Sequence, residues 1–153
     1  MELISSLPAG SQLGLLGLIS FFASTILPVG SEWLVAMLVA KGHEISTVVI
    51  VATFGNTLGS VTTYLLGTWG MDRIAVKWQN ISPRRMQQAR RFYARYGVWS
   101  LLLSWLPVIG DAFCLMAGIF RAHLISFLLL VVLGKGIRYA TLAIIVMQAS
   151  GKQ

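Results

Sequence analysis

The sequence carries little charge for its length. Aspartate, glutamate, lysine and arginine make up 11% of its 153 residues, whereas soluble domains contain about 25%. Hydrophobic residues make up 56%, above the roughly 45–50% of soluble domains. This composition excludes an ordinary soluble protein and predicts an integral membrane protein. The length fits a single membrane domain over residues 1–153.

Cysteines and catalytic motifs are also scarce. Cys114 is the only cysteine, so no intrachain disulfide can form. No basic residue precedes the first apolar run, so we expect no cleavable signal peptide. The patterns GxSxG, HExxH and Walker A are absent, and His43 and His123 lie far from each other in the sequence. We therefore expect no enzyme, no metal site and no cofactor.

Almost all of the net charge lies in one stretch. The chain has a net charge of +7, and residues 71–96 contribute +6 of it through seven basic residues and one acidic residue. In a soluble protein this charge would suggest nucleic acid, but a short basic loop between apolar segments is typical of the cytoplasmic side of a membrane. We expect this linker to contact anionic lipids and no nucleic acid. Within it, Ser82 to Gly97 predicts an amphipathic helix on the membrane surface.

Two apolar segments are long enough to cross the membrane. Thr47 to Trp69 contains no charged residue, and Leu124 to Gln148 contains only Lys135 and Arg138. At about 1.5 Å per residue, each helix exceeds the roughly 30 Å of a hydrocarbon core. We therefore predict two membrane-spanning helices.

Two further apolar regions are interrupted near their middle. Leu13 to Ala40 is broken after Leu27, and Val98 to Phe120 is broken after Leu106. Each arm of the second region reaches roughly 14 Å as a helix, about half of the hydrocarbon thickness. Such a break predicts a re-entrant hairpin whose freed backbone groups are buried in protein or line a wet cavity, with four ordinary crossings as the alternative. The hairpin breaks are assigned to Pro28, Gly30, Pro107 and Gly110.

The two broken regions repeat each other at an offset of 79 residues. Leu27-Pro28-Val29 aligns with Leu106-Pro107-Val108, Glu32 aligns with Asp111, and Gly55 aligns with Gly134. If each hairpin-plus-helix unit crosses the membrane once, the second copy is inverted relative to the first. We predict an all-α fold of two inverted repeats, about 13–70 and 97–149, joined by the basic linker 71–96. Chance identity is the alternative to duplication.

Two acids occupy matching positions at the hairpin breaks. Glu32 and Asp111 lie inside the predicted membrane domain, where a charged side chain costs about 2.5–3.5 kcal/mol on insertion scales. Acids at this depth are typical of proton or substrate pathways, so we predict that both take and release protons. The alternative is that each caps the second half-helix of its hairpin, because acids favour helix N-termini.

Polar residues on the long helices are the candidate substrate-binding groups. Lys135 and Arg138 are three residues apart and share one face of the last helix. They could pair with Glu32 and Asp111 in a neutral cluster, hold an anionic headgroup, or snorkel to the interface. Asn56 is a neutral polar group at a depth where it needs a partner. We assign Lys135, Arg138 and Asn56 to substrate binding.

Small residues recur at four-residue spacing along the first long helix. Gly55, Gly59 and Gly67 form this stripe, with Thr63 between them. Such spacing lets helices approach closely in lipid. We predict that the stripe packs against another helix, with a substrate role as the less favoured alternative.

Together these segments resemble the DedA superfamily, also called the VTT or SNARE-associated domain, and within it the short YqaA-like branch. The resemblance covers about Leu13 to Met147. It rests on four segments: residues 28–32, 55–67, 93–97 and 105–118. Gly134 and Arg138 match the last helix of the family.

The resemblance implies two opposed re-entrant hairpins and a role in moving lipids in the bacterial inner membrane. Bacterial members are linked to proton-dependent recycling of undecaprenyl phosphate or to phospholipid translocation, and Glu32 matches the family's acid in the first hairpin. We expect a proton-coupled flippase or scramblase that binds membrane lipids, with undecaprenyl phosphate and a second copy of the chain as candidate partners. The alternative is a non-transporting protein that supports envelope assembly by binding partners through its basic face.

The chain departs from the family pattern at the second hairpin. Typical members carry arginines on both sides of the hairpin proline, whereas this chain has Ser104 before Pro107 and Gly110-Asp111 after it. The resemblance therefore does not carry a phosphate-binding role over to this hairpin. Lys135 and Arg138 are the expected substitutes, or the substrate differs.

Overall fold

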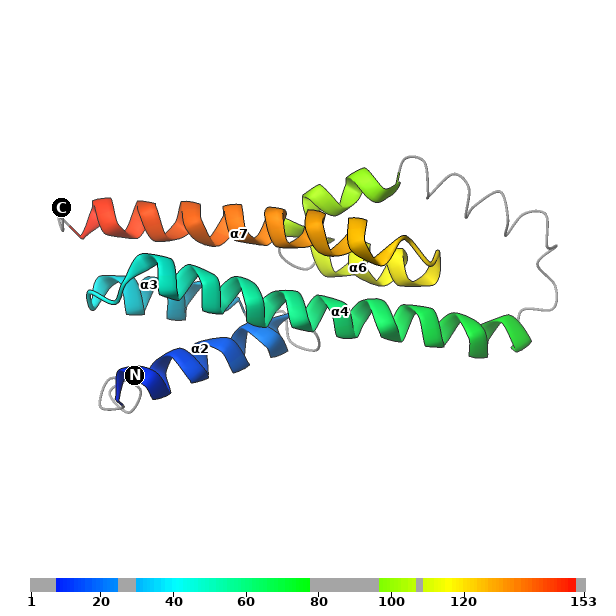
Figure 1. The fold of residues 1–153 in the computed structure, drawn as a ribbon, viewed down its shortest axis with the longest axis horizontal. Helices are drawn as coiled ribbons and strands as arrows, with labels where there is room; N and C mark the ends of the chain where they lie inside the picture. Colours follow the sequence, from blue (N-terminus) through cyan, green and yellow to red (C-terminus); the bar gives the residue numbers. More distant parts are fainter. Residues whose placement is uncertain (1–7, 25–29, 78–96, 107–108, 151–153) are drawn as a thin grey trace. The chain divides into compact units, whose positions relative to one another are not determined.

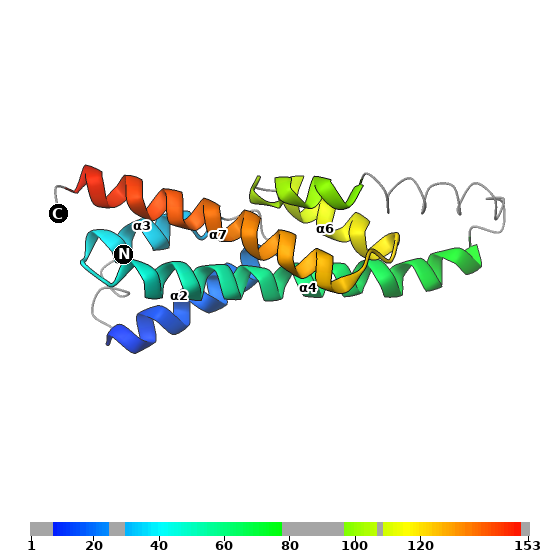
Figure 2. The same cartoon turned by 45° about the horizontal axis from the view of Figure 1, so that its top comes forward.

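The computed structural model describes residues 8–24, 30–77, 97–106 and 109–150. Its regular elements in these ranges are all helical, in agreement with the predicted all-α class. In chain order (Figures 1 and 2) they are α2 (Ala9–Ala23), α3 (Glu32–Ala40), α4 (Ile45–Lys77), the 3₁₀ helix η2 (Val98–Trp105), α6 (Ile109–Ile119) and α7 (Leu124–Ala149). The predicted amphipathic helix over 82–96 and the two hairpin prolines, Pro28 and Pro107, lie outside the described residues.

Two helices are long and apolar enough to cross a membrane by length and composition. They are Ile45–Gly70, which is the greater part of α4, and Leu124–Ala149, which is α7. Each has 26 residues, and about 20 apolar residues suffice to span a bilayer. The predicted crossings Thr47 to Trp69 and Leu124 to Gln148 therefore each fall within one continuous helix.

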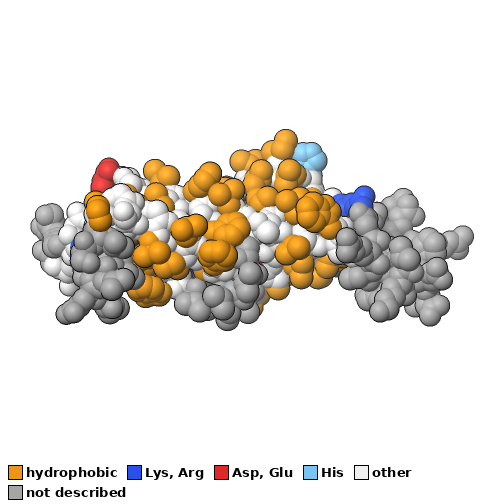
Figure 3. All heavy atoms as spheres, turned by 90° about the horizontal axis from the view of Figure 1, so that it is seen from below, with side chains coloured by type: hydrophobic (Ala, Val, Ile, Leu, Met, Phe, Trp, Pro, Cys, Tyr) orange, Lys and Arg blue, Asp and Glu red, His pale blue; other side chains and the backbone are white. Residues whose placement is uncertain are grey.

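Large apolar side chains are exposed along these helices. Phe54 is 66% exposed, Trp69 is 65% exposed and Ile125 is 62% exposed. In Figure 3 hydrophobic side chains cover much of the described surface in view. Apolar surface on this scale is unusual in soluble monomers and suits contact with hydrocarbon.

By its internal contacts the chain forms two compact units. Unit 1 comprises residues 1–59 and 135–153, and unit 2 comprises residues 60–134. The long helices α4 and α7 therefore each contribute one part to each unit. Each unit has its own buried core.

Unit 1 packs α2, α3, the first part of α4 and the second part of α7. Its core includes the fully buried side chains of Leu16, Leu34, Val35, Leu38, Val48 and Ala143. A Cβ added to Gly55 would lie 2.4 Å from the carbonyl oxygen of Gly17. A Cβ added to Gly59 would lie equally close, 2.4 Å, to the carbonyl oxygen of Phe21. Two glycines of the small-residue stripe thus lie where α4 meets the backbone of α2.

Glu44 directly precedes α4 and contacts its first turn. Its carboxylate accepts hydrogen bonds from the hydroxyls of Ser46 at 2.6 Å and Thr47 at 2.7 Å. Just before it, Gly42 has a φ of 90°, a left-handed conformation that glycine adopts without steric cost. The turn from α3 into α4 thus contains one glycine with a positive φ and one acid that is hydrogen-bonded to the first turn of α4.

Unit 2 packs the second part of α4, η2, α6 and the first part of α7. Its buried core comprises Tyr64, Leu101, Cys114, Ala117, Ala122, Phe127 and Val131. The Tyr64 hydroxyl donates a hydrogen bond to the carbonyl oxygen of Ala122 at 2.7 Å. A Cβ added to Gly67 would lie 2.5 Å from the carbonyl oxygen of Leu115. This third glycine of the stripe thus lies against α6.

The second interrupted region differs from the sequence prediction in two respects. Its first arm is the 3₁₀ helix η2, and α6 already begins at Ile109, so Gly110 lies in a helical turn and not in the break. The Gly110 amide donates a hydrogen bond to the carbonyl oxygen of Leu106 at 2.9 Å. A Cβ on Gly110 would lie 2.4 Å from the carbonyl oxygen of Ser104. Glycine is needed here because the two arms approach closely.

Candidate functional site

A buried polar network lies inside unit 1, with Asn56 of α4 at its centre. Asn56 is only 6% exposed. Its Oδ1 atom accepts a hydrogen bond from Lys135 Nζ, and its Nδ2 atom donates one to the Tyr139 hydroxyl at 2.8 Å. Both ends of the amide are therefore bonded, as burial among apolar side chains requires.

Lys135 of α7 is almost completely buried, with 2% exposure. Besides Asn56, its Nζ atom donates to the Ser24 hydroxyl at 2.8 Å. Ser24 is the C-terminal cap of α2. The lysine thus joins the end of α2 to the middle of α4.

Tyr139 extends the network to the start of α3. Its hydroxyl lies 2.6 Å from the hydroxyl of Ser31, the residue that precedes α3. Tyr139 and Ser31 are each 1% exposed. Because Tyr139 also bonds Asn56, it connects α7 with α3 and α4 through one oxygen atom.

Glu32 and Arg138 form an ion pair at the edge of the network. The Glu32 side chain is 30% exposed and the Arg138 side chain is 18% exposed, so the ion pair is partly accessible to solvent. Glu32 is the first residue of α3, and its carboxylate lies directly over Gly30. A side chain at position 30 would therefore displace the carboxylate.

One face of α7 supplies most of these contacts. Lys135, Arg138 and Tyr139 are spaced at i, i+3 and i+4 and so lie on the same side of the helix. Lys135 and Arg138 carry two formal positive charges, and Glu32 carries one negative charge.

Asp111 belongs to unit 2. It lies in the first turn of α6 and is half-buried, while Glu32 begins α3. Each acid thus lies at a helix N-terminus, where the helix dipole favours negative charge.

The sequence prediction missed three members of the network, namely Ser24, Ser31 and Tyr139. Tyr139 could have been found, because it is four residues from Lys135 and shares its face of α7. The two serines adjoin the first hairpin break, and their partners lie more than 100 residues away in the sequence. No local pattern indicates that pairing.

The described residues offer no obvious metal centre. Within them no three His, Cys, Asp or Glu side chains gather closely enough to hold a metal ion.

Comparison with known proteins identifies the domain that contains this network. Residues 27–148 match the VTT domain, a range that includes the whole network except Ser24. The chain belongs to the VTT-domain, or DedA, family. It is similar to the inner membrane protein YqaA of Escherichia coli strain K12, with 39% identity over 125 residues that cover 81% of this chain and 83% of that protein.

A second VTT-domain relative shows a similar degree of identity. An uncharacterized protein of Haemophilus influenzae is 40% identical over 131 residues, which are 80% of each chain. No solved structure matches this chain. The family match, the inner-membrane relative and the two long apolar helices together show that this chain is a bacterial inner-membrane protein.

Proposed function

We propose that this protein moves lipids across the inner membrane as a proton-coupled flippase or scramblase for phospholipid or polyprenyl phosphate. The observation that carries the proposal is the ion pair of Glu32 and Arg138 beside the buried Lys135, within helices made mostly of apolar residues. Ionisable groups inside a membrane domain are costly and typically line substrate or proton pathways.

The ion pair suggests how proton uptake and headgroup binding are linked. Protonation removes the negative charge of Glu32 and with it the partner of Arg138. The guanidinium can then hold a phosphate through two parallel hydrogen bonds, a geometry that arginine favours. Loss of the proton restores the ion pair and releases the headgroup. Asp111 would exchange a proton in the corresponding place in unit 2.

Features of both repeats support two related halves inverted in the membrane. Lys135 and Asn56 are equivalent under the 79-residue offset and bond to each other. An interrupted pair of helices precedes each long helix. Inverted repeats with broken helices are typical of transporters, in which the substrate lies near the midplane. As part of the same proposal, the two interrupted regions are re-entrant hairpins that enter and leave the membrane on the same side.

A second candidate, a non-transporting protein that supports envelope assembly, has one observation in its favour. Asn56, Lys135 and Tyr139 find their hydrogen-bond partners within the protein. A network bonded in this way could simply hold α2, α3, α4 and α7 together. This role requires no transport.

Reconstitution distinguishes the two candidates. The purified protein is placed in liposomes whose phospholipids carry a fluorescent group, and a membrane-impermeant reductant bleaches the outer leaflet. A translocating protein brings inner-leaflet lipid to the reductant, so fluorescence falls below the half that protein-free vesicles retain. Equal bleaching with and without correctly folded protein, for phospholipid and polyprenyl phosphate alike, would exclude translocation.

A further inference from the structure

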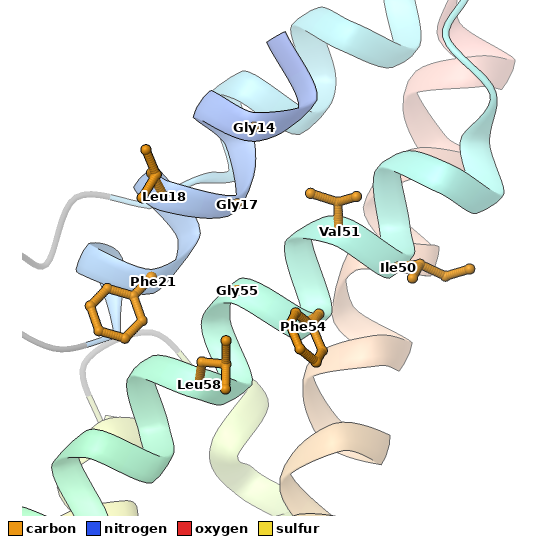
Figure 4. A pocket seen from close by; sticks show the side chains of 9 residues that line it. All are labelled: Gly14, Gly17, Leu18, Phe21, Ile50, Val51, Phe54, Gly55 and Leu58. Carbon is orange, nitrogen blue, oxygen red and sulfur yellow. The ribbon is translucent and has the colours of Figure 1, made fainter. Parts of the chain in front are cut away.

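A groove runs between α2 and α4 on the outside of unit 1. It has a volume of about 540 Å³, and every lining residue is apolar or a glycine. In Figure 4, Leu18 and Phe21 extend from α2, while Val51 and Phe54 extend from α4. The groove is separate from the polar network, whose residues do not line it.

Glycines create this groove. A Cβ added to Gly14 would meet nothing within 4 Å, so the space beside it is open. At Gly17 and Gly55 the two backbones touch, which leaves a floor without side chains. Leu18 and Phe54, at 59% and 66% exposure, border the open side.

The size and chemistry of the groove favour a single hydrocarbon chain over a protein helix. A helix about 10 Å across occupies roughly 120 Å³ per residue of rise, so this volume would hold only about one turn. A hydrocarbon chain has no polar group to satisfy and matches an entirely apolar lining. The groove also belongs to a protein of the inner membrane, where such chains surround it.

The groove continues toward the polar network. Phe21 lines it, and Ser24, one turn further along α2, accepts the hydrogen bond from Lys135. On α4, Gly59 lies against both Phe21 and Ser24. Phe21 in the groove wall is thus about one helical turn, roughly 5 Å along α2, from a network that contains the positively charged Lys135, a separation that suits a molecule with a hydrocarbon chain and an anionic head.

We propose that this groove binds one hydrocarbon chain of a membrane lipid. Within the proposed function the occupant is the apolar part of the transported lipid, and this role rests on that function. Binding of the chain does not require transport, so the two are tested separately.

The test measures where a lipid chain contacts the protein. The full chain is placed in liposomes that contain a phospholipid with a photoactivatable diazirine at the end of one acyl chain, and labelled peptides are mapped by mass spectrometry. We expect labelling at Leu18 and Phe54 to exceed that at Ile125 and Leu129, which are 62% and 61% exposed on α7 and report ordinary bilayer contact.

Two glycine variants provide the matched comparison. Gly14→Leu places a side chain in the open groove, whereas Gly10→Leu makes the same change one turn earlier, outside the groove and also with nothing within 4 Å. We expect groove labelling to fall about tenfold in Gly14→Leu, equivalent to about 1.4 kcal/mol, and to stay at the wild-type level in Gly10→Leu. Phe54→Ala removes a side chain that lines the groove and adds no bulk. We expect labelling at Leu18 to fall in this variant as well.

Several results would overturn the proposal. One is equal labelling of the groove and of the α7 reference positions. Another is unchanged groove labelling in both Gly14→Leu and Phe54→Ala. Intermolecular crosslinking of Phe54 that displaces the lipid label would assign the groove to a second copy of the chain. Labelling of the groove is measured without a transport assay. A protein that binds the lipid chain but does not translocate lipid would therefore refute the proposed function and not this inference.

Discussion

Lys135 donates a hydrogen bond to the side chain of Asn56, the residue 79 positions before it. The same offset relates the two hairpin prolines, Pro28 and Pro107, and the two hairpin acids. The α4 and α7 helices therefore bond through positions that are equivalent in the sequence repeat. Two members of the polar network thus occupy matching positions of the predicted sequence repeat.

Asn56 should be the residue on which the network depends most. Asn56→Leu removes one acceptor of Lys135 and the donor to Tyr139, although Lys135 keeps Ser24 and Tyr139 keeps Ser31. Each lost hydrogen bond costs about 0.5–1.5 kcal/mol, or about 1.5–3 kcal/mol where one partner is charged. We expect a lower unfolding temperature in detergent, measured by fluorescence-detected size exclusion after heating. Asn56→Asp retains acceptors for Lys135 and should lose less. A wild-type unfolding temperature in Asn56→Leu would contradict the central place given to this amide.

Glu44 should make stability depend on pH at the start of α4. Hydrogen bonds from Ser46 and Thr47 lower the pKa of its carboxyl below the ordinary value. A lowered pKa in the folded state means that the ionised form stabilises the protein above the unfolded-state pKa, about 4.3. That contribution is lost as the pH falls through the lower, folded-state pKa.

The measurement for Glu44 compares unfolding temperatures of wild type and Glu44→Gln from pH 7 to pH 3. We expect a small advantage for wild type at pH 7 that disappears at the acidic end, because the side chain is fully exposed and the effect is modest. An advantage that grows on acidification would contradict the assigned cause.

Topology distinguishes re-entrant hairpins from ordinary crossings. With one true crossing on each side of the basic linker 71–96, both chain ends lie on the side opposite the cytoplasmic linker. Four full crossings would instead place both ends in the cytoplasm. Reporter fusions at residues 1 and 153, with a fusion within the linker as the cytoplasmic reference, should show both ends outside the cytoplasm. Cytoplasmic ends would refute the hairpin arrangement.

Arg138 should be sensitive to both its charge and its shape. Arg138→Ala leaves Glu32 without its cation, a loss that costs about 3–5 kcal/mol when a pair is fully buried and less at this partly exposed site. We expect Arg138→Ala to lower protein level and transport more than Arg138→Lys, which keeps the charge without the planar fork. Adding Glu32→Gln to Arg138→Ala should restore part of the protein level. Wild-type behaviour of Arg138→Ala in both assays would mean that this side chain does not act in the network.

Much of the fold follows from the sequence, because membrane-spanning helices are encoded by long local apolar runs. Both long helices contain the predicted crossings, and in the first interrupted region α2 ends at Ala23 and α3 begins at Glu32. The 3₁₀ geometry of η2 and the start of α6 at Ile109 were not predictable. The close approach of Gly110 to Ser104 was not predictable either, because no local pattern encodes it.

The candidate site was predictable in part for the same reason. Charged and amide groups inside apolar runs stand out, so Glu32, Asn56, Lys135 and Arg138 were identified, and the structure brings these four together in unit 1. Their roles in transport remain predictions. Serine is common at helix ends for other reasons, so Ser24 and Ser31 carried no signal.

The central claim is that Glu32 couples proton exchange to lipid movement. The most direct measurement is the rate of lipid translocation in liposomes with and without an imposed pH gradient, for wild type, Glu32→Gln, Asp111→Asn and the control Glu44→Gln. Glutamine and asparagine keep the approximate shape of the acids but cannot exchange the proton. We predict that the gradient changes the rate for wild type and Glu44→Gln, and that the response is lost in Glu32→Gln and weakened in Asp111→Asn. A full gradient response in both Glu32→Gln and Asp111→Asn would contradict the account and leave both acids with a capping role alone.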